Sequence, residues 1–196
     1  MKKVLIIAGE ASGDLHGSNL VQELLRQDPS VAVFGVGSRK MRDAGVTMLS
    51  DAAEISVVGA TEVLTHLGAI YRVYEKLKRF LRDERPDLLV LIDFPDFNIL
   101  VGKAARKLGV PVLYYISPQV WAWRKGRVRT IAGLVKAIMV LFPFEVDLYR
   151  EAGADVRFVG HPLVDVVRSE LTREQARERF GLDLRSRPGA LLPGSR

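Results

Sequence analysis

Carboxylate and hydroxyl side chains gather in a short glycine-rich loop near the start of the chain. This loop reads Gly9-Glu10-Ala11-Ser12-Gly13-Asp14 and follows an apolar run. A glycine-rich loop that opens a helix can bind phosphate, but this one matches neither the dinucleotide-binding motif nor the Walker motif. The carboxylates of Glu10 and Asp14 would repel phosphate, whereas they can accept hydrogen bonds from sugar hydroxyls. The alternative is that Ser12 or Asp14 caps the helix that follows.

A second loop follows the most apolar run of the sequence and reads Asp93-Phe94-Pro95-Asp96-Phe97-Asn98. A carboxylate in such a place can act as the general base that takes a proton from an attacking hydroxyl. Asp96 is our candidate for this role. Because Asp96 follows a proline and precedes a helix, it could instead be a helix N-cap, and the two roles do not exclude each other.

A third loop combines tryptophans with cations and reads Ser117-Pro118-Gln119-Val120-Trp121-Ala122-Trp123-Arg124-Lys125-Gly126-Arg127. Aromatic faces stack on sugar rings, and cations pair with phosphate. The same composition suits single-stranded nucleic acid, which proteins bind by stacking and charge. A structural alternative places one tryptophan in the core and leaves the cations in water.

A fourth loop carries a histidine in Gly160-His161-Pro162, and the sequence offers no metal-ligand spacing beside it. A single histidine in a turn is more often structural than catalytic. The other histidines, His16 and His66, are not close to His161 in the sequence. The chain has no cysteine, which excludes disulfides, thiolate metal sites and a cysteine nucleophile.

Short apolar runs alternate with helical patterns along most of the chain, which predicts a parallel sheet covered on both faces. The expected strands are 4–8, 31–36, 46–49, 87–93, 110–116, 137–141 and 156–159. The expected helices are 15–26, 40–44, 61–85 with a break at Gly68, and 97–108 with Gly109 just past its end. We therefore expect an α/β, Rossmann-like, doubly wound domain of six or seven strands. In such a sheet the four loops lie at the carboxyl ends of strands, where ligands bind.

The last part of the sequence has a different pattern. Residues 171–181 predict a helix that Thr172 caps and Gly181 ends. Residues 190–192 predict a new strand that leads into a Gly-Ser turn. We therefore expect residues 1–170 to form one domain, and 171–196 to form a linker and the first strand and loop of a second domain that the chain otherwise lacks.

The overall composition is that of a globular protein and favours an anionic partner. Of 196 residues, 48% are hydrophobic and 27% charged, and the net charge is +6. The start of the chain does not fit a signal peptide, and no apolar run is long enough to cross a bilayer. The segment 55–82 begins with apolar residues, and lysines and arginines follow in its later turns. Such a helix can lie on an anionic membrane, although it more commonly packs its apolar face on a sheet.

Motifs spread over the whole chain, in the same order, resemble those of the lipid-A-disaccharide synthases. They are Ala8-Gly9-Glu10-Ala11-Ser12-Gly13-Asp14, Ile92-Asp93-Phe94-Pro95-Asp96-Phe97-Asn98, Ser117-Pro118-Gln119-Val120-Trp121-Ala122-Trp123-Arg124, Leu141-Phe142-Pro143-Phe144-Glu145, Gly160-His161-Pro162 and Leu191-Leu192-Pro193-Gly194-Ser195-Arg196. The resemblance implies the N-terminal, acceptor-binding half of a two-domain GT-B glycosyltransferase. It also implies an inverting transfer of 2,3-diacylglucosamine from UDP to the 6-hydroxyl of 2,3-diacylglucosamine 1-phosphate, with release of UDP.

The same resemblance implies roles for individual residues. Asp96 corresponds to the catalytic base, and Arg196 to an arginine that contacts the donor phosphates. The residues expected to bind substrate are Glu10, Ser12, Gly13, Asp14, Asp93, Asn98, Ser117, Gln119, Trp121 and Arg196. The family implies neither metal nor cofactor, and it implies a cytoplasmic protein on the inner face of the inner membrane. We expect an anionic membrane surface as a partner and no nucleic acid.

Two alternatives differ from this interpretation in class. One is another two-domain UDP-sugar enzyme, such as an undecaprenyl-linked N-acetylglucosaminyl transferase or a UDP-sugar epimerase. The other is a basic nucleic-acid-binding module without catalytic activity, for which the glycine-carboxylate loops would have no use.

Overall fold

The computed structural model describes residues 1–55, 60–119, 126–167, 169–183, 186–187 and 189–191. It divides into two compact units, Met1–His161 and Pro162–Arg196. The larger unit holds the sheet and the helices that cover it.

The larger unit is built on a seven-stranded sheet in which all paired strands are parallel. The strands are β1 (Lys3–Ala8), β2 (Ala32–Gly37), β3 (Thr47–Asp51), β4 (Leu88–Ile92), β5 (Val112–Tyr115), β6 (Ala137–Val140) and β7 (Val156–Phe158). Their order is β3-β2-β1-β4-β5-β6-β7, so the chain changes direction across the sheet between β1 and β4. The expected Rossmann-like sheet and its seven strands are confirmed.

Successive residues of each central strand point to opposite faces, and both faces are apolar. In β1, Leu5 and Ile7 belong to one core cluster, while Val4 and Ile6 belong to the other. All four side chains are buried. A strand that is buried on both sides reads as a continuous apolar run, which is why the sequence predicts these strands so clearly.

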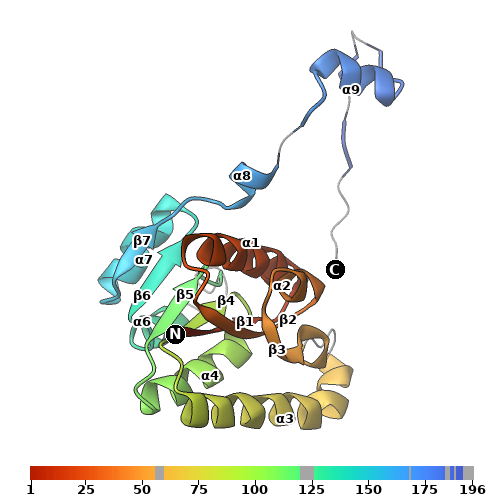
Figure 1. Ribbon diagram of the computed structural model, residues 1–196. Coiled ribbons are helices and arrows are strands. Elements are labelled where there is room, and N and C mark those ends of the chain that lie inside the picture. Colours follow the sequence, from red (N-terminus) through yellow and green to blue (C-terminus); the bar gives the residue numbers. More distant parts are fainter. Residues whose placement is uncertain (56–59, 120–125, 168, 184–185, 188, 192–196) are drawn as a thin grey trace. The chain divides into compact units, whose positions relative to one another are not determined.

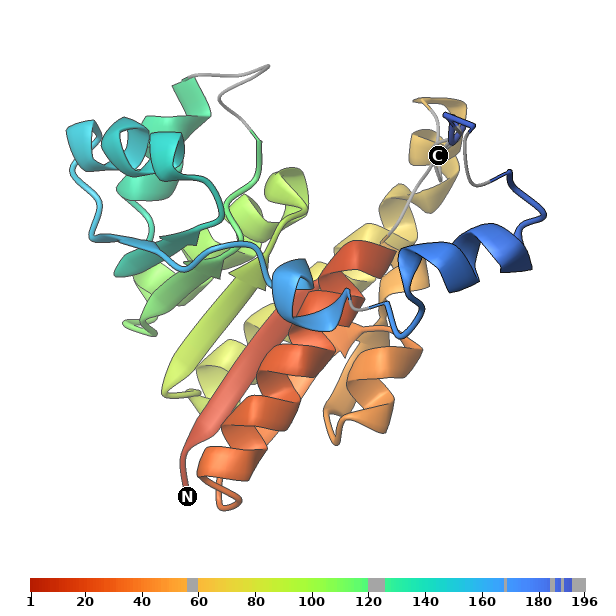
Figure 2. The same ribbon diagram turned by 90° about the horizontal axis from the view of Figure 1, so that it is seen from above.

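Helices cover both faces of the sheet. They are α1 (Ala11–Gln27), α2 (Arg39–Asp43), η1 (Ala52–Glu54), α3 (Ala60–Glu84), α4 (Pro95–Lys107), α6 (Gly126–Ala132) and α7 (Pro143–Glu151). Figure 1 shows α1 and α2 on one face and α3 and α4 on the other. Figure 2 views the molecule from the α1 side, with α1 lying along the central strands. Residues of α3, α4, α6 and α7 belong to the core cluster that contains Leu5 and Ile7, so these helices cover the same face.

Two helices begin at least two residues earlier than predicted, and the break expected inside a third is absent. Helix α1 begins at Ala11 rather than at residue 15, so Ser12 and Asp14 lie inside its first turn and Glu10 is the N-cap. Helix α4 begins at Pro95, because a proline needs no N–H partner in the first turn. Helix α3 runs without a break through Gly68, since one glycine costs a helix only about 1 kcal/mol.

The smaller unit contains α8 (Leu163–Val166) and α9 (Arg173–Arg179). Thr172 caps α9 as predicted, because its side chain accepts a hydrogen bond from the backbone N–H of Gln175. Gly181 follows the helix with a positive φ of 62°, also as predicted. The strand expected at residues 190–192 is wrong for its described part, because residues 190 and 191 are in no strand. Within the described part of the chain, no helix is long and apolar enough to cross a membrane.

Candidate functional site

The loops predicted to carry chemistry meet at the carboxyl edge of the sheet. The loops after β1 and β4 are neighbours, because these two strands pair. This is the point at which the strand order reverses, and parallel α/β sheets bind their ligands at such a switch point. The loops that follow β5, β6 and β7 continue along the same edge. The sheet therefore places side chains from distant parts of the sequence around one region.

The loops after β1 and β4 touch at Gly9 and Phe94. A Cβ atom on Gly9 would lie 2.4 Å from the Phe94 ring, so only glycine allows this approach. Asp93 and Phe94 both adopt left-handed backbone conformations, with φ of 46° and 45°. Left-handed conformations of residues other than glycine cluster at functional sites, because the surrounding structure must hold them.

Buried side chains hold the turn at Asp93. The amide of Asn98 donates hydrogen bonds to the carbonyl oxygens of Ile92 at 3.1 Å and of Asp93 at 2.8 Å. The hydroxyl of Tyr114 donates to the same Asp93 carbonyl at 2.6 Å. Burial and the nearby Asp93 charge raise the pKa of Tyr114 well above its ordinary value, so the hydroxyl keeps its proton. Asn98 is fully buried and acts on the site through the backbone of Asp93.

Asp14 caps a helix, but not the one predicted. Its carboxylate accepts hydrogen bonds from the backbone N–H groups of Ser38 at 2.6 Å, Lys40 at 3.0 Å and Met41 at 3.2 Å. These groups form the N-terminus of α2, whose own N-cap residue makes no side-chain cap. Asp14 is only 4% exposed. It therefore fixes α2 against α1. In the same turn of α1, Ser12 is exposed, whereas Gly13 is buried beside Ala8.

Asp96 lies in the first turn of α4 and is not the N-cap of that helix. The N-cap is Phe94, whose side chain makes no capping hydrogen bond. The Asp96 carboxylate is 74% exposed and forms an ion pair with Arg127, whose side chain is 23% exposed. The cap alternative for Asp96 is therefore wrong. The exposed carboxylate lies beside the carboxyl edge of β4, where it could meet a ligand.

Ser117 and Glu145 connect the end of β5 to the start of α7. The Ser117 hydroxyl donates to Glu145 Oε1 at 2.6 Å. The other oxygen, Oε2, accepts from the backbone N–H groups of Leu141 at 3.1 Å and Phe142 at 3.0 Å. Ser117 is 5% exposed and Glu145 only 1%. Glu145 is missing from the predicted set, although a glutamate in the first turn after Phe-Pro is a recognisable capping signal.

The structure brings together two histidines that are far apart in the sequence. The ring centroids of His16 and His161 are 6.1 Å apart, and Phe142 lies 6.2 Å from His161. His16 is 7% exposed, and its Nδ1 has no hydrogen-bond partner among the described residues. Burial lowers the pKa of His16, and the nearby His161 lowers it further, while Asp93 acts in the opposite direction. No sequence spacing signals this cluster, because only the sheet brings α1 and the loop after β7 together.

A stacked aromatic pair stands beside the histidines. The rings of Phe142 and Phe144 lie nearly parallel, with centroids 5.7 Å apart. Phe144 is 53% exposed and Phe142 is 36% exposed. An exposed aromatic face is a surface on which a sugar ring or an acyl chain can pack.

Of the remaining predicted site residues, one is exposed and two lie outside the described part of the chain. Gln119 is exposed at the end of the described part of the third loop. Trp121 and Arg196 lie outside the described residues, as does the apolar segment 56–59. Within the described part, no group of three His, Asp or Glu side chains could hold a metal ion. What remains accessible is a set of oxygen acceptors, Glu10, Ser12, Asp93 and Asp96, that suits hydroxyl groups.

Comparison with known proteins places the chain among relatives of one kind. A model of the lipid-A-disaccharide synthetase family matches residues 4–196. The lipid-A-disaccharide synthase of Geobacter metallireducens is 58% identical over 195 residues, which is 100% of this chain and 51% of that protein. The synthase of Syntrophus aciditrophicus is 52% identical, with 100% and 51% covered. The chain therefore spans about half the length of the curated relatives it matches.

Solved structures share the fold at low sequence identity. A UDP-GlcNAc 2-epimerase from Neisseria meningitidis superposes with a TM-score of 0.61 and 14% identity, over 83% of this chain and 47% of that one. MurG from Acinetobacter baumannii gives 0.54 and 19%, over 83% and 46%. These likenesses confirm the expected fold, and each covers about half of the solved chain.

Proposed function

Because the chain belongs to the lipid-A-disaccharide synthase family, we propose that it forms the acceptor-binding half of a lipid A glycosyltransferase. The observation that carries this proposal is the family match over residues 4–196, nearly the whole chain. The carboxylates at the switch point of the sheet support it, since they are suited to sugar hydroxyls. The reaction we propose joins 2,3-diacylglucosamine, carried by UDP, to the 6-hydroxyl of 2,3-diacylglucosamine 1-phosphate.

The proposed reaction is a direct displacement with inversion at the anomeric carbon. The 6-hydroxyl oxygen attacks that carbon and passes its proton to the base, while the bond to the diphosphate oxygen breaks. UDP leaves with the bonding electrons. The step needs a base for the hydroxyl and positive charge for the departing diphosphate. We assign the first task to Asp96 and part of the second to Arg196, which lies outside the described residues.

We propose that the remaining site residues act in two ways. The residues that would contact the acceptor are Glu10, Ser12, Asp93, Gln119 and Trp121. The buried members would act by holding the loops in place. These are Gly13, Asp14, Asn98 and Ser117, which are at most slightly exposed. Substitution of a buried member should therefore reduce stability along with activity.

We also propose where the protein works and how its parts divide the task. Residues 1–170 would form the acceptor domain, with residues 171–196 leading toward a donor-binding part. Both proposed substrates carry acyl chains, so the enzyme would act at the cytoplasmic face of the inner membrane. The exposed apolar side chains of Leu67 and Tyr71 on α3 support contact with a bilayer.

Substitution of the proposed base provides the test. In a protein that spans the full length of the family, Asp96→Asn should lower turnover by roughly 100-fold or more. The affinity for substrate should change little, because the amide keeps the shape of the carboxylate. Thermal stability should also be preserved, because Asp96 is exposed and an exposed ion pair contributes at most about 1 kcal/mol.

A matched control separates the loss of the base from the loss of one surface charge. Asp43 is also an exposed helical aspartate, paired with Arg39 at 3.4 Å on the opposite side of the sheet. Asp43→Asn should leave turnover unchanged. Near-normal turnover of Asp96→Asn would remove Asp96 from the mechanism and make Asp93 or Glu10 the next candidate.

A further inference from the structure

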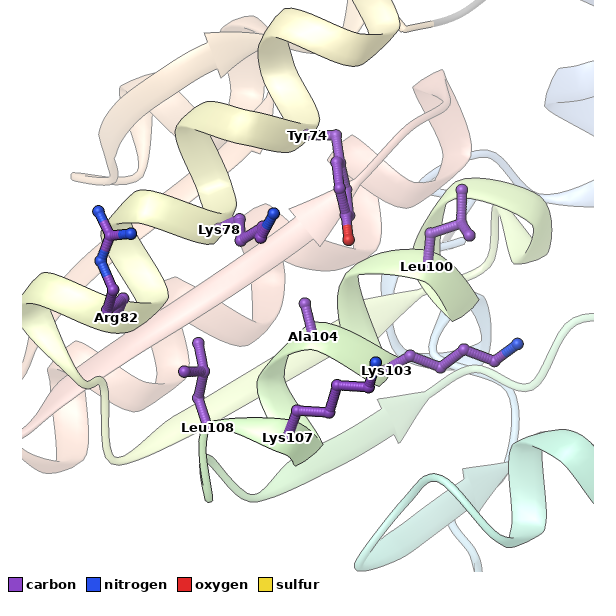
Figure 3. A pocket seen from close by; sticks show the side chains of 8 residues that line it. All are labelled: Tyr74, Lys78, Arg82, Leu100, Lys103, Ala104, Lys107 and Leu108. Carbon is purple, nitrogen blue, oxygen red and sulfur yellow. The ribbon is translucent and has the colours of Figure 1, made fainter.

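A groove with cations along its sides lies between α3 and α4, away from the loops of the candidate site. Its volume is about 400 Å³. The lining residues are Tyr74, Lys78, Arg82, Leu100, Lys103, Ala104, Lys107 and Leu108. Figure 3 shows that Tyr74, Lys78 and Arg82 come from α3, and that Leu100, Lys103, Ala104 and Lys107 come from α4. We call these eight residues the α3–α4 groove.

The groove combines apolar surface with positive charge. Along α3, Tyr74, Lys78 and Arg82 recur at helical spacing and so share one face. Along α4, Leu100 precedes Ala104 and Leu108 in the same way. Leu100 is 52% exposed, although neighbouring positions of α4 are in the core. An exposed aliphatic side chain gains free energy when an apolar group covers it.

Exposed apolar side chains extend this surface toward the start of α3. Leu67 is 50% exposed and Tyr71 is 64% exposed. They precede Tyr74 at helical spacing, so the apolar strip runs directly into the α3–α4 groove. An apolar strip that ends among cations is typical of surfaces that contact both the acyl chains and the headgroups of a membrane.

The charged side chains that line the groove are all cations. Among the residues that the structure describes, no acidic one lines it. A second hollow of about 610 Å³ shares Lys103 and Lys107 and adds Arg106 and Arg129, and none of the described residues that line it is acidic. Lys103 and Lys107 therefore belong to two hollows at once, and an anion in either would be attracted to them.

The cations of the groove are available to a ligand. Lys78 pairs with Glu75 at 3.1 Å and Arg82 with Asp83 at 2.9 Å, but both pairs are exposed and therefore weak. Neither Lys103 nor Lys107 forms an ion pair with any residue that the structure describes. Cations in the last turn of a helix also stabilise it through the helix dipole. That effect accounts for Lys107 but not for the exposed apolar strip beside it.

We propose that the α3–α4 groove binds the phosphate headgroup of an anionic membrane phospholipid, with the lipid's apolar part against Tyr74 and Leu100. This inference rests on the proposed membrane location of the enzyme and gives that contact a place on the chain. Phosphate pairs with lysine and arginine, and each such residue adds to the attraction of an anionic bilayer. Nucleic acid would use the cations but would leave the aliphatic side chains exposed.

The test measures binding of the chain to vesicles, without any substrate. The vesicles are made of phosphatidylcholine alone or of equal parts of phosphatidylcholine and phosphatidylglycerol. The chain should float with the anionic vesicles at low salt and much less at high salt. Lys103→Glu combined with Lys107→Glu should weaken this binding by at least about 10-fold. Leu100→Ser should also weaken it, with no change in net charge.

A second double substitution controls for the change in net charge. Lys2 and Lys40 are exposed and lie outside the groove. Lys2→Glu combined with Lys40→Glu alters the net charge by the same amount and should retain most of the vesicle binding. Equal losses in the two double variants would overturn the proposal, because the attraction would then depend on net charge alone. Unchanged binding of the groove variant would overturn it as well.

Two further measurements distinguish phospholipid binding from nucleic-acid binding and from the proposed catalytic function. A single-stranded oligonucleotide that binds the chain and competes with vesicles for the groove lysines would assign the groove to nucleic acid instead. Turnover on detergent-dispersed substrates should be unaffected by the groove variant, because no groove residue lies at the candidate site. A failed vesicle test with normal turnover would therefore reject the groove and leave the proposed function standing.

Discussion

At the residue scale, Asp14 is a carboxylate of the site that the backbone holds firmly. Its two oxygens accept three backbone N–H groups at the start of α2, and the residue is buried. Each of those N–H groups would lose its partner if the side chain were removed. An unsatisfied buried donor costs about 1–3 kcal/mol.

We therefore predict that Asp14→Ala destabilises the protein by about 1–3 kcal/mol or more. In a chain of this size, each kcal/mol corresponds to a loss of about 2–4 °C in melting temperature. Asp14→Asn should cost less, because one oxygen remains to accept from Ser38 and Met41. Thermal unfolding of both variants checks the order. Equal stability of Asp14→Ala and the unmodified chain would contradict the assigned cap.

The types of the site residues were predictable, but several of their partners were not. The loops with Glu10, Asp93 and Asp96 were recognised because polar residues directly follow apolar strands. The partner of Asp14 is a helix more than twenty residues further along the chain, so local pattern suggested its own helix instead. The pairing of His16 with His161 had no local signal at all.

At the element scale, glycines decide how closely the elements around the site approach one another. Gly13 and Gly17 lie on the side of α1 that faces the sheet, where a Cβ would come within 3.2 Å of Ala8 and 3.3 Å of Ile92. Close packing offsets the cost of about 1 kcal/mol that each glycine brings to a helix. The helical pattern predicts a later start for α1 because the first turn contains Gly13, and glycine disfavours helices. The strands were predicted well because burial on both faces makes them continuous apolar runs.

Gly9 provides the test of how the loops after β1 and β4 are coupled. Gly9→Ala would place a Cβ 2.4 Å from the Phe94 ring, so the turn at Asp93 must shift. Such overpacking typically costs about 1–3 kcal/mol. In a Phe94→Ala background most of the clash is removed, and the same substitution should cost clearly less. Denaturant unfolding of the unmodified chain and the three variants of this cycle measures the coupling. Additive effects would show that the two loops do not depend on each other.

At the scale of the whole molecule, the parallel sheet explains why the site is assembled from distant loops. All carboxyl ends of the strands lie on one edge, so α1, the β4 loop and the segment after β7 converge there. This convergence buries polar groups that would be hydrated in the unfolded chain. His16 is the clearest case, because its ring is enclosed and its Nδ1 has no partner among the described residues.

The buried His16 leads to a prediction for the stability of the whole chain at mildly acidic pH. Burial lowers the pKa of His16 below its ordinary value of 6.5 in the folded state, and His161 adds to the effect. As the pH falls below 6.5, the unfolded chain therefore takes up a proton at His16 before the folded chain does. The free energy of unfolding should therefore decrease as the pH falls through this window, until His16 is also protonated in the folded state. Above pH 6.5 the residue should contribute no pH dependence.

His16→Gln removes this titration, so the variant should lose less melting temperature than the unmodified chain between a neutral and a mildly acidic buffer. The comparison concerns the change with pH in each protein, which makes it independent of any constant cost of the substitution. His161→Gln should give an intermediate slope, because burial remains the larger cause of the lowered pKa. Scanning calorimetry at several pH values measures all three slopes. Identical slopes in the unmodified chain and His16→Gln would show that the histidine pair does not influence folding, and that the acid sensitivity comes from carboxylates alone.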